Sequence, residues 1–130
     1  MKVLIADEDW EFAHRALAHF ETCADLVLWE PQTEWVAQRT ASWRPDLLIV
    51  SARQVEQGVL EHLPGGALRP AILVTEHMAD SDRAWRAWQR GGDELLLKPV
   101  FHSRDLREAA TNALRHAACN WADLPLAASA

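Results

Sequence analysis

Short apolar runs alternate with longer segments of mixed polarity along the chain. The central run, residues 47–50, is four consecutive apolar residues between Asp46 and Ser51. A continuous apolar run of this length is typical of a parallel strand that is buried on both faces. Four other runs have the same character, and helix-length segments separate them: residues 3–6, 26–29, 71–74 and 95–97. This alternation predicts an α/β domain with one parallel sheet and helices on both of its faces.

Capping residues and apolar spacing place the helices between these runs. Asp9 is a good N-cap for a helix to about residue 23, because its carboxylate accepts hydrogen bonds from unpaired amides of the first turn. The predicted buried face of that helix has apolar residues at steps of three and four: Trp10, Ala13, Leu17 and Phe20. The other predicted helices are residues 33–43, 54–63, 82–90 and 103–119. We therefore expect one domain over residues 1–119 and a short C-terminal tail over residues 120–130.

Composition and charge narrow the classes of function. A chain of 130 residues is long enough for one domain and too short for two of ordinary size. The net charge of −6 argues against a nucleic-acid partner, which needs a concentrated positive surface. No run approaches the ~18 apolar residues of a membrane span, and the N-terminus opens into a strand instead of a signal peptide. We expect no membrane partner and a cytoplasmic location.

Polar residues stand at the positions where the predicted strands end. In a doubly wound parallel sheet, ligands bind at the carboxyl ends of the strands. The residues at these ends are Asp7, Glu8, Asp9, Ser51, Thr75 and Lys98. Clustered carboxylates favour Mg²⁺, although Asp9 as a helix cap explains part of the triplet equally well. Lys98 can pair with Asp7 or with a phosphate bound between them, and the bond before Pro99 is a candidate for cis geometry.

Four segments of the chain occur together in the order found in one family. They are KVLIADED at residues 2–9, PDLLIV at 45–50, ILVT at 72–75 and GGDELLLKP at 91–99. Over residues 2 to about 119, this ordered set resembles the receiver domain of two-component response regulators. The resemblance implies a flavodoxin-like, doubly wound fold with five parallel strands in the order 2-1-3-4-5. It also implies the family's chemistry, in which a histidine kinase donates a phosphoryl group to an aspartate that ends the third strand.

The chain departs from that family at the phosphoacceptor. The matching positions are Asp7 and Glu8 for the Mg²⁺ pair, Thr75 for the hydroxyl and Lys98 for the lysine. Ser51 stands where the family has the aspartate. A serine hydroxyl is a poor nucleophile unless a base activates it, and no His lies near it in the sequence. The missing carboxylate leaves at most weak Mg²⁺ binding at Asp7 and Glu8, so we expect no resident cofactor.

Further departures lie around the same position. Leu95 replaces the aromatic residue that reports phosphorylation in the family, and a leucine has no ring to move. Glu76 stands where the family has a small residue, and its carboxylate repels phosphate. Arg53 adds a positive charge at this rim. The prediction is a pseudo-receiver, a non-enzymatic signalling module that acts independently of aspartyl phosphorylation.

The resemblance also implies a partner surface. In receivers it is the face made by the fourth helix, the fifth strand and the fifth helix, which here contains Trp85, Arg86 and Leu95. Trp and Arg are the residues that most often anchor protein interfaces. We expect a protein partner there, a second copy of the chain being one candidate. The alternative is that the tryptophans pack on the sheet and the arginines form a solvated face.

An enzyme is the alternative function. Asp7 and Asp9 have the Asp-x-Asp spacing of haloacid-dehalogenase-like phosphatases, and Thr75 and Lys98 fit that family's later motifs. Against this reading, no further acidic pair follows Lys98 and no insert is present to exclude water. The interaction module is the favoured prediction.

Overall fold

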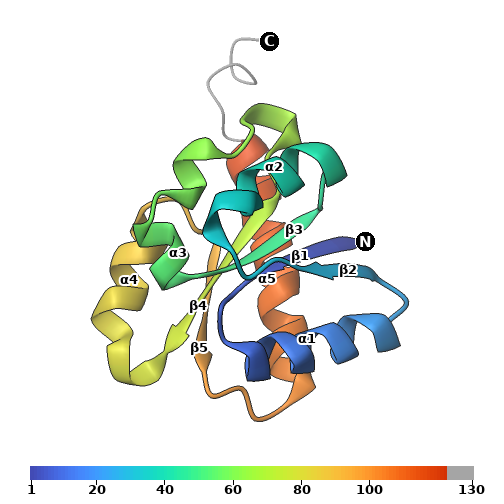
Figure 1. Cartoon of the computed structure of the whole chain (residues 1–130), viewed down its shortest axis with the longest axis vertical. Coiled ribbons are helices and arrows are strands. Elements are labelled where there is room, and N and C mark those ends of the chain that lie inside the picture. Colours follow the sequence, from blue (N-terminus) through green and yellow to red (C-terminus); the bar gives the residue numbers. More distant parts are fainter. Residues whose placement is uncertain (123–130) are drawn as a thin grey trace.

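Five parallel strands form one sheet in the order β2-β1-β3-β4-β5 (Figure 1). The computed structural model describes residues 1–122, with side chains through residue 119. The strands are β1 (Lys2–Ala6), β2 (Leu26–Trp29), β3 (Leu47–Ser51), β4 (Ala71–His77) and β5 (Glu94–Lys98). Every pairing between neighbouring strands is parallel. The predicted doubly wound sheet and its strand order are confirmed.

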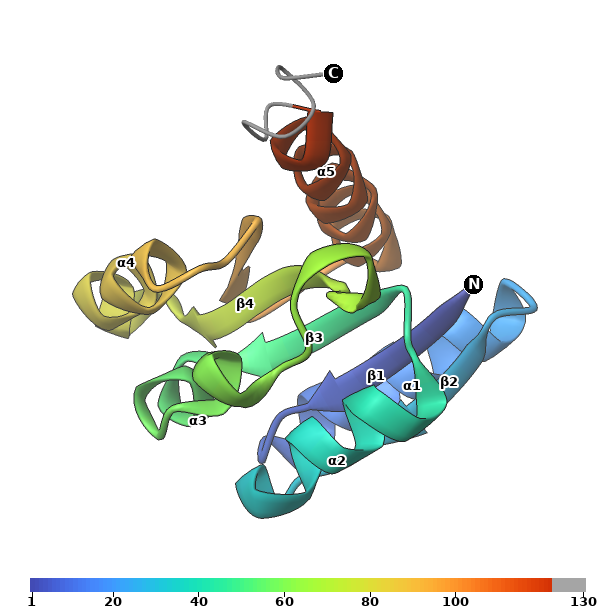
Figure 2. The same ribbon diagram turned by 90° about the horizontal axis from the view of Figure 1, so that it is seen from above.

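Helices cover both faces of this sheet (Figure 2). They are α1 (Trp10–Thr22), α2 (Thr33–Trp43), α3 (Ala52–Glu56), α4 (Ser81–Gln89) and α5 (Ser103–Ala122). Three short 3₁₀ helices, η1 (Val59–His62), η2 (Gly66–Leu68) and η3 (Met78–Asp80), complete the connections. Helices α1 and α5 pack on one face of the sheet, and α2, α3 and α4 pack on the other. Within the described residues, no helix has the length and apolar composition that crossing a bilayer requires.

The side chains of each strand alternate between two cores. Val3 and Ile5 of β1 point to the core under α1 and α5, and Leu4 and Ala6 point to the core under the other helices. The strand β3 lies between β1 and β4 and is buried at every position. Its continuous apolar sequence follows from this placement, because helices cover both of its faces.

Two of the sequence predictions are wrong in detail. Trp10 is 60% exposed, because Phe12 and Ala16 fill that part of the buried face of α1, whereas the predicted Ala13 and Phe20 are buried. The helix predicted over residues 54–63 is divided into α3 and η1 at Gly58, whose φ of 93° is left-handed and suits glycine. Helix α5 extends to Ala122 and so includes the first residues of the predicted tail. Residues 123–130 of that tail lie outside the described residues.

Candidate functional site

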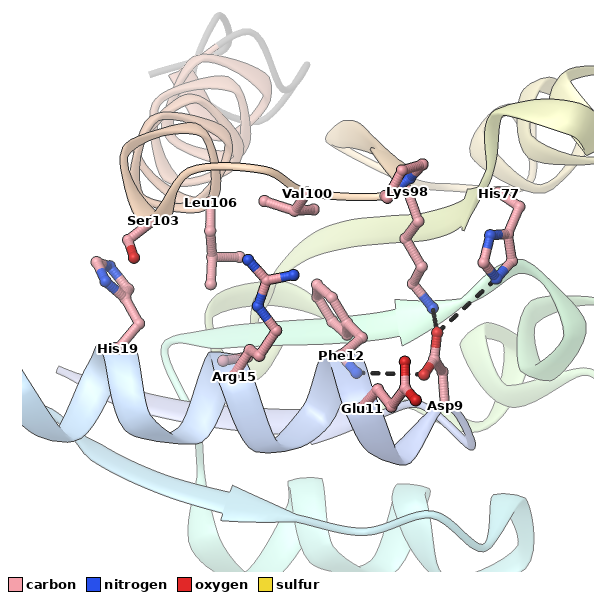
Figure 3. A pocket seen from close by; sticks show the side chains of 12 residues that line it. Asp9, Glu11, Phe12, Arg15, His19, His77, Lys98, Val100, Ser103 and Leu106 are labelled. Carbon is pink, nitrogen blue, oxygen red and sulfur yellow. Dashed lines mark hydrogen bonds and ion pairs between the residues drawn. The ribbon is translucent and has the colours of Figure 1, made fainter.

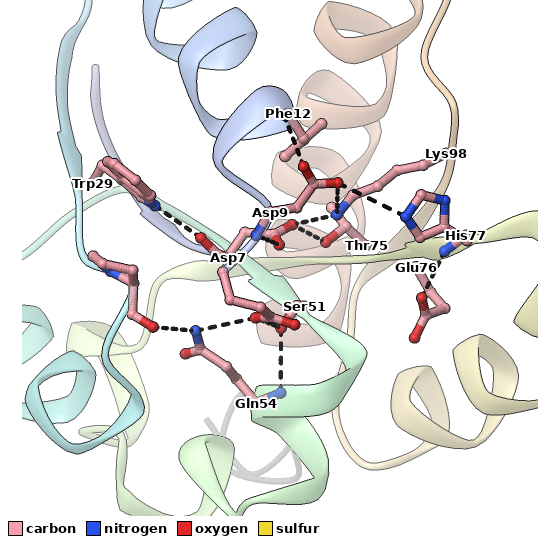
Figure 4. A network of polar contacts seen from close by, with 12 residues as sticks. Asp7, Asp9, Phe12, Trp29, Ser51, Gln54, Thr75, Glu76, His77 and Lys98 are labelled. Carbon is pink, nitrogen blue, oxygen red and sulfur yellow. Dashed lines mark hydrogen bonds and ion pairs between the residues drawn. The ribbon is translucent and has the colours of Figure 1, made fainter.

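The carboxyl ends of four strands bring Asp7, Ser51, Thr75 and Lys98 together (Figure 4). Asp7 follows β1, Ser51 ends β3, Thr75 lies near the end of β4, and Lys98 ends β5. Asp7 and Thr75 are fully buried, and Ser51 and Lys98 are 4% and 5% exposed. A parallel sheet places these ends at one edge, so residues far apart in the sequence meet there.

Both carboxylate oxygens of Asp7 are hydrogen-bonded within the protein. Its Oδ2 accepts from Thr75 Oγ1 at 2.6 Å and from Lys98 Nζ at 2.8 Å. Its Oδ1 accepts from the backbone N–H of Asp9 at 3.0 Å. A buried carboxylate is stable only with such compensation, and the Lys98 ammonium supplies the opposite charge. Asp7 and Lys98 therefore form a satisfied buried ion pair.

Asp9 extends the ion pair toward the surface and caps α1. Its Oδ2 lies 3.3 Å from Lys98 Nζ and 3.8 Å from His77 Nε2, and its Oδ1 accepts from the Phe12 N–H at 3.2 Å. The predicted N-cap is thus confirmed. Partial burial raises the pKa of Asp9, but the Phe12 amide, Lys98 and His77 together outweigh it, so the pKa is lowered. Near neutral pH the side chain is a carboxylate paired with the Lys98 ammonium.

Substituting Asp9 tests this electrostatic role through pH. Asp9→Asn keeps a capping side chain and removes the charge. Since the folded-state pKa lies below the ordinary value of 3.8, the stabilisation by the carboxylate is present above that value. It is lost as the pH falls through the folded-state pKa. Urea unfolding should show Asp9→Asn less stable than wild type by about 1 kcal/mol near neutral pH, with the difference vanishing in acid. A difference that is the same at every pH would contradict this role.

The hydroxyl of Ser51 is engaged as both donor and acceptor. It donates to Glu8 Oε2 at 2.7 Å and accepts from the backbone N–H of Gln54 at 3.2 Å, which makes Ser51 the N-cap of α3. The side chain of Gln54 is buried. Its Nε2 donates to the carbonyl oxygen of Pro31 at 3.1 Å and lies 3.5 Å from Glu8 Oε2. No His lies near Ser51 in the sequence, but Glu8, 43 positions away, accepts a hydrogen bond from its hydroxyl.

A cavity of about 340 Å³ lies over this network. Glu76 is on its wall and is 9% exposed, and its carboxylate accepts from the His77 N–H and lies 3.7 Å from Arg83 Nε. The lining mixes acids and bases: Glu8, Asp9, Ser51, Arg53, Thr75, Glu76, His77, Asp80, Arg83 and Lys98. Acidic and basic side chains therefore face the same cavity.

The residues present do not fit a resident Mg²⁺, the ion that the resemblance implies. Mg²⁺ needs carboxylate oxygens that are free to coordinate it. Both oxygens of Asp7 accept hydrogen bonds, and Glu8 Oε2 accepts from Ser51. Across the described part of the chain, no group of three or more His, Cys, Asp or Glu side chains is placed to hold a metal ion.

Three residues of the network were not predicted from the sequence. Trp29 donates from Nε1 to the backbone carbonyl of Asp7 at 2.8 Å. Gln54 connects Glu8 to the loop before α2, and His77 reaches Asp9 because β4 extends two residues beyond Thr75. The position of Trp29 at a strand end could have predicted that its side chain lies near the site. Nothing in the sequence around Gln54 indicates that its side chain is buried.

Among the described side chains, the predicted partner surface has one exposed aromatic ring. Trp85 is 55% exposed, and its ring stacks on Trp88 with centroids 4.9 Å apart. Arg86 is also exposed. Leu95 is half-buried and packs against the core under α2, α3 and α4. Leu95 therefore contributes more to the core than to a contact surface, because β5 turns this side chain toward the helices.

Comparisons with family models and with curated proteins give no match. Solved structures do match. A response regulator receiver domain protein from Methanospirillum hungatei JF-1 is 16% identical with a TM-score of 0.71, over 92% of this chain and 97% of that one. A two-component response regulator from Clostridium difficile is 17% identical with a TM-score of 0.70, over 88% and 96%. A response regulator receiver domain protein from Clostridium thermocellum is 21% identical with a TM-score of 0.67, over 92% and 98%. The chain has the fold of response regulator receiver domains.

Proposed function

We propose that this chain is a pseudo-receiver, a cytoplasmic signalling module that acts through protein–protein contacts and not through aspartyl phosphorylation. One observation carries the proposal: the residue that ends β3 is Ser51, and its hydroxyl is held between Glu8 and the Gln54 amide. In the receiver family this position holds the aspartate that accepts the phosphoryl group. The Ser51 hydroxyl caps α3 and donates to Glu8, and a hydroxyl does not form the acyl phosphate that an aspartate carboxylate forms.

The other groups of the pocket support the same proposal. The resemblance assigns Thr75 and Lys98 to contacts with the phosphoryl group. Both side chains instead bond to Asp7, and Lys98 also bonds to Asp9. The charge of Lys98 is already balanced by Asp7 and Asp9, so this ammonium attracts an incoming phosphoryl group less strongly.

Intact mass after incubation with Mg²⁺ and acetyl phosphate tests this proposal. We expect no added phosphoryl group on the wild-type protein, while a receiver that has the aspartate gains one under the same conditions. Ser51→Ala serves as the matched variant. A stoichiometric adduct that hydroxylamine removes, in the wild type and in Ser51→Ala alike, would show that another carboxylate is the acceptor and would contradict the proposal.

We propose the exposed part of α4, with Trp85 and Arg86, as the contact surface for a protein partner. A large exposed indole beside a guanidinium is typical of interface anchors. A second copy of the chain is one candidate partner. Sedimentation velocity of the wild type and of Trp85→Ser tests that candidate, since a monomer at every concentration excludes it.

The geometry does not favour the phosphatase alternative. Asp7, which that mechanism needs as an accessible nucleophile, is fully buried and accepts three hydrogen bonds. Asp9 pairs with Lys98 and caps α1. A nucleophile must reach the phosphorus atom in line with the leaving group, and a buried carboxylate whose oxygens are hydrogen-bonded cannot do so.

A further inference from the structure

A second cavity lies between α1 and the loop that leads from β5 to α5 (Figure 3). Its volume is about 130 Å³. Much of its lining is apolar: Phe12, Ala16, Pro99, Val100 and Leu106. An apolar cavity of roughly 150 Å³ accommodates benzene in another protein. The size of this cavity therefore suits one aromatic ring or one branched aliphatic group.

Arg15 provides an unpaired positive charge on the wall of this cavity. Figure 3 shows its guanidinium rising from α1 toward Leu106 and Val100. Among the residues with described side chains, it forms neither a hydrogen bond nor an ion pair, and Glu11, one turn before it, does not pair with it. An arginine in this position is available to a ligand, since its fork of N–H donors matches a carboxylate.

Glu11 also lines the cavity, but Figure 3 shows its carboxylate at the Asp9 end, so Arg15 is the charged side chain on the Ser103 and His19 side. On the opposite wall, Lys98 is neutralised by Asp7 and Asp9. His19 lies one turn after Arg15 on α1, and Ser103, the first residue of α5, lies beside His19 (Figure 3). The side chains of Ser103 and His19 offer hydrogen-bond donors beside the guanidinium.

We propose that this cavity binds a small organic anion, a monocarboxylate that carries one aromatic ring or one branched aliphatic group. The carboxylate pairs with Arg15 and accepts a hydrogen bond from Ser103, while the apolar group packs between Phe12, Ala16 and Leu106. Binding requires both the carboxylate and the apolar group of the ligand, because the cavity has one charged end and one apolar end. Such a ligand gives the module a chemical input other than a phosphoryl group.

Benzoate and isovalerate are the probes for this site. In ¹⁵N NMR titrations we expect saturable shifts of the Phe12, Ala16 and Ser103 amides, with a Kd on the order of 1 mM or tighter for the better probe. Benzyl alcohol lacks the charge and acetate lacks the apolar group, so each should bind at least about tenfold more weakly than the better probe. Arg15→Gln should weaken its binding at least about tenfold. Arg104→Gln, an exposed arginine at the start of α5 outside the cavity lining, should leave it unchanged.

Three outcomes would overturn this inference. One is the absence of saturable binding by both probes. The second is equal weakening by Arg15→Gln and Arg104→Gln, which would indicate general charge attraction. The third is equal affinity for benzyl alcohol and benzoate. None of these outcomes depends on phosphoryl transfer, so failure here and failure of the proposed function are distinguishable.

Discussion

Replacing Lys98 with Met is expected to lower the free energy of unfolding by about 3–5 kcal/mol. Lys98 is 5% exposed and Asp7 is fully buried, so the ammonium is the buried partner of that charge. Without it, Asp7 keeps only the Thr75 hydroxyl and the Asp9 N–H. Removing one member of a buried pair leaves an uncompensated charge, which is far less favourable than removing both. Urea unfolding at neutral pH measures the effect.

The double variant Asp7→Asn with Lys98→Met is the control for this prediction. It removes both charges and keeps side chains of similar size, so most of the lost stability should return. The buried-pair account would be contradicted by a loss below about 1 kcal/mol in Lys98→Met. It would also be contradicted by a double variant that is no more stable than the single one.

Introducing an aspartate with Ser51→Asp is expected to destabilise the protein when Mg²⁺ is absent. The Ser51 hydroxyl lies 2.7 Å from Glu8 Oε2, so a carboxylate placed there meets a second carboxylate. Ser51→Asn is the matched variant, because Asn and Asp both cap helices and only Asp adds charge. We expect Ser51→Asp to be less stable than Ser51→Asn by roughly 1–3 kcal/mol, the free energy of shifting a carboxyl pKa by one to two units.

Mg²⁺ should reverse this difference. Ser51→Asp adds a third carboxylate at the strand ends and removes the hydroxyl that donates to Glu8, so Glu8 and the new carboxylate are both free to coordinate a divalent ion. At an ion concentration 100 times its Kd, binding adds about 2.7 kcal/mol to the stability of that variant. The wild type should gain less than about 0.5 kcal/mol from the same concentration. Equal stabilisation of both proteins by Mg²⁺ would contradict the account.

The sequence was sufficient to predict the five strands, their shared edge and the placement of the main polar groups. Apolar runs and helix caps have local causes, so the strands and the Asp9 cap could be recognised residue by residue. The meeting of Asp7 with Lys98 also followed, because every parallel strand presents its carboxyl end to the same edge.

The sequence was not sufficient where a side chain's direction depends on tertiary packing. The apolar pattern of α1 admits either Trp10 or Phe12 on its buried face, and Phe12 is the one that packs in the core with α5. Glu8 follows β1 and Ser51 ends the neighbouring strand β3, so their proximity was predictable, but the hydrogen bond between them was not. The burial of Gln54 arises in the same way, from a loop before α2 that supplies Pro31 as an acceptor.

The central claim is that the protein's own groups occupy the phosphoacceptor pocket. A ¹⁵N NMR titration of the wild type tests it most directly. Mg²⁺ is added first and acetyl phosphate second, and the amides of Asp7, Glu8, Ser51, Thr75 and Lys98 are followed. The account predicts no saturable shift at any of these amides. Saturable shifts there, spreading along β4 and α4, would show that the pocket opens to ion and phosphate and would contradict the claim.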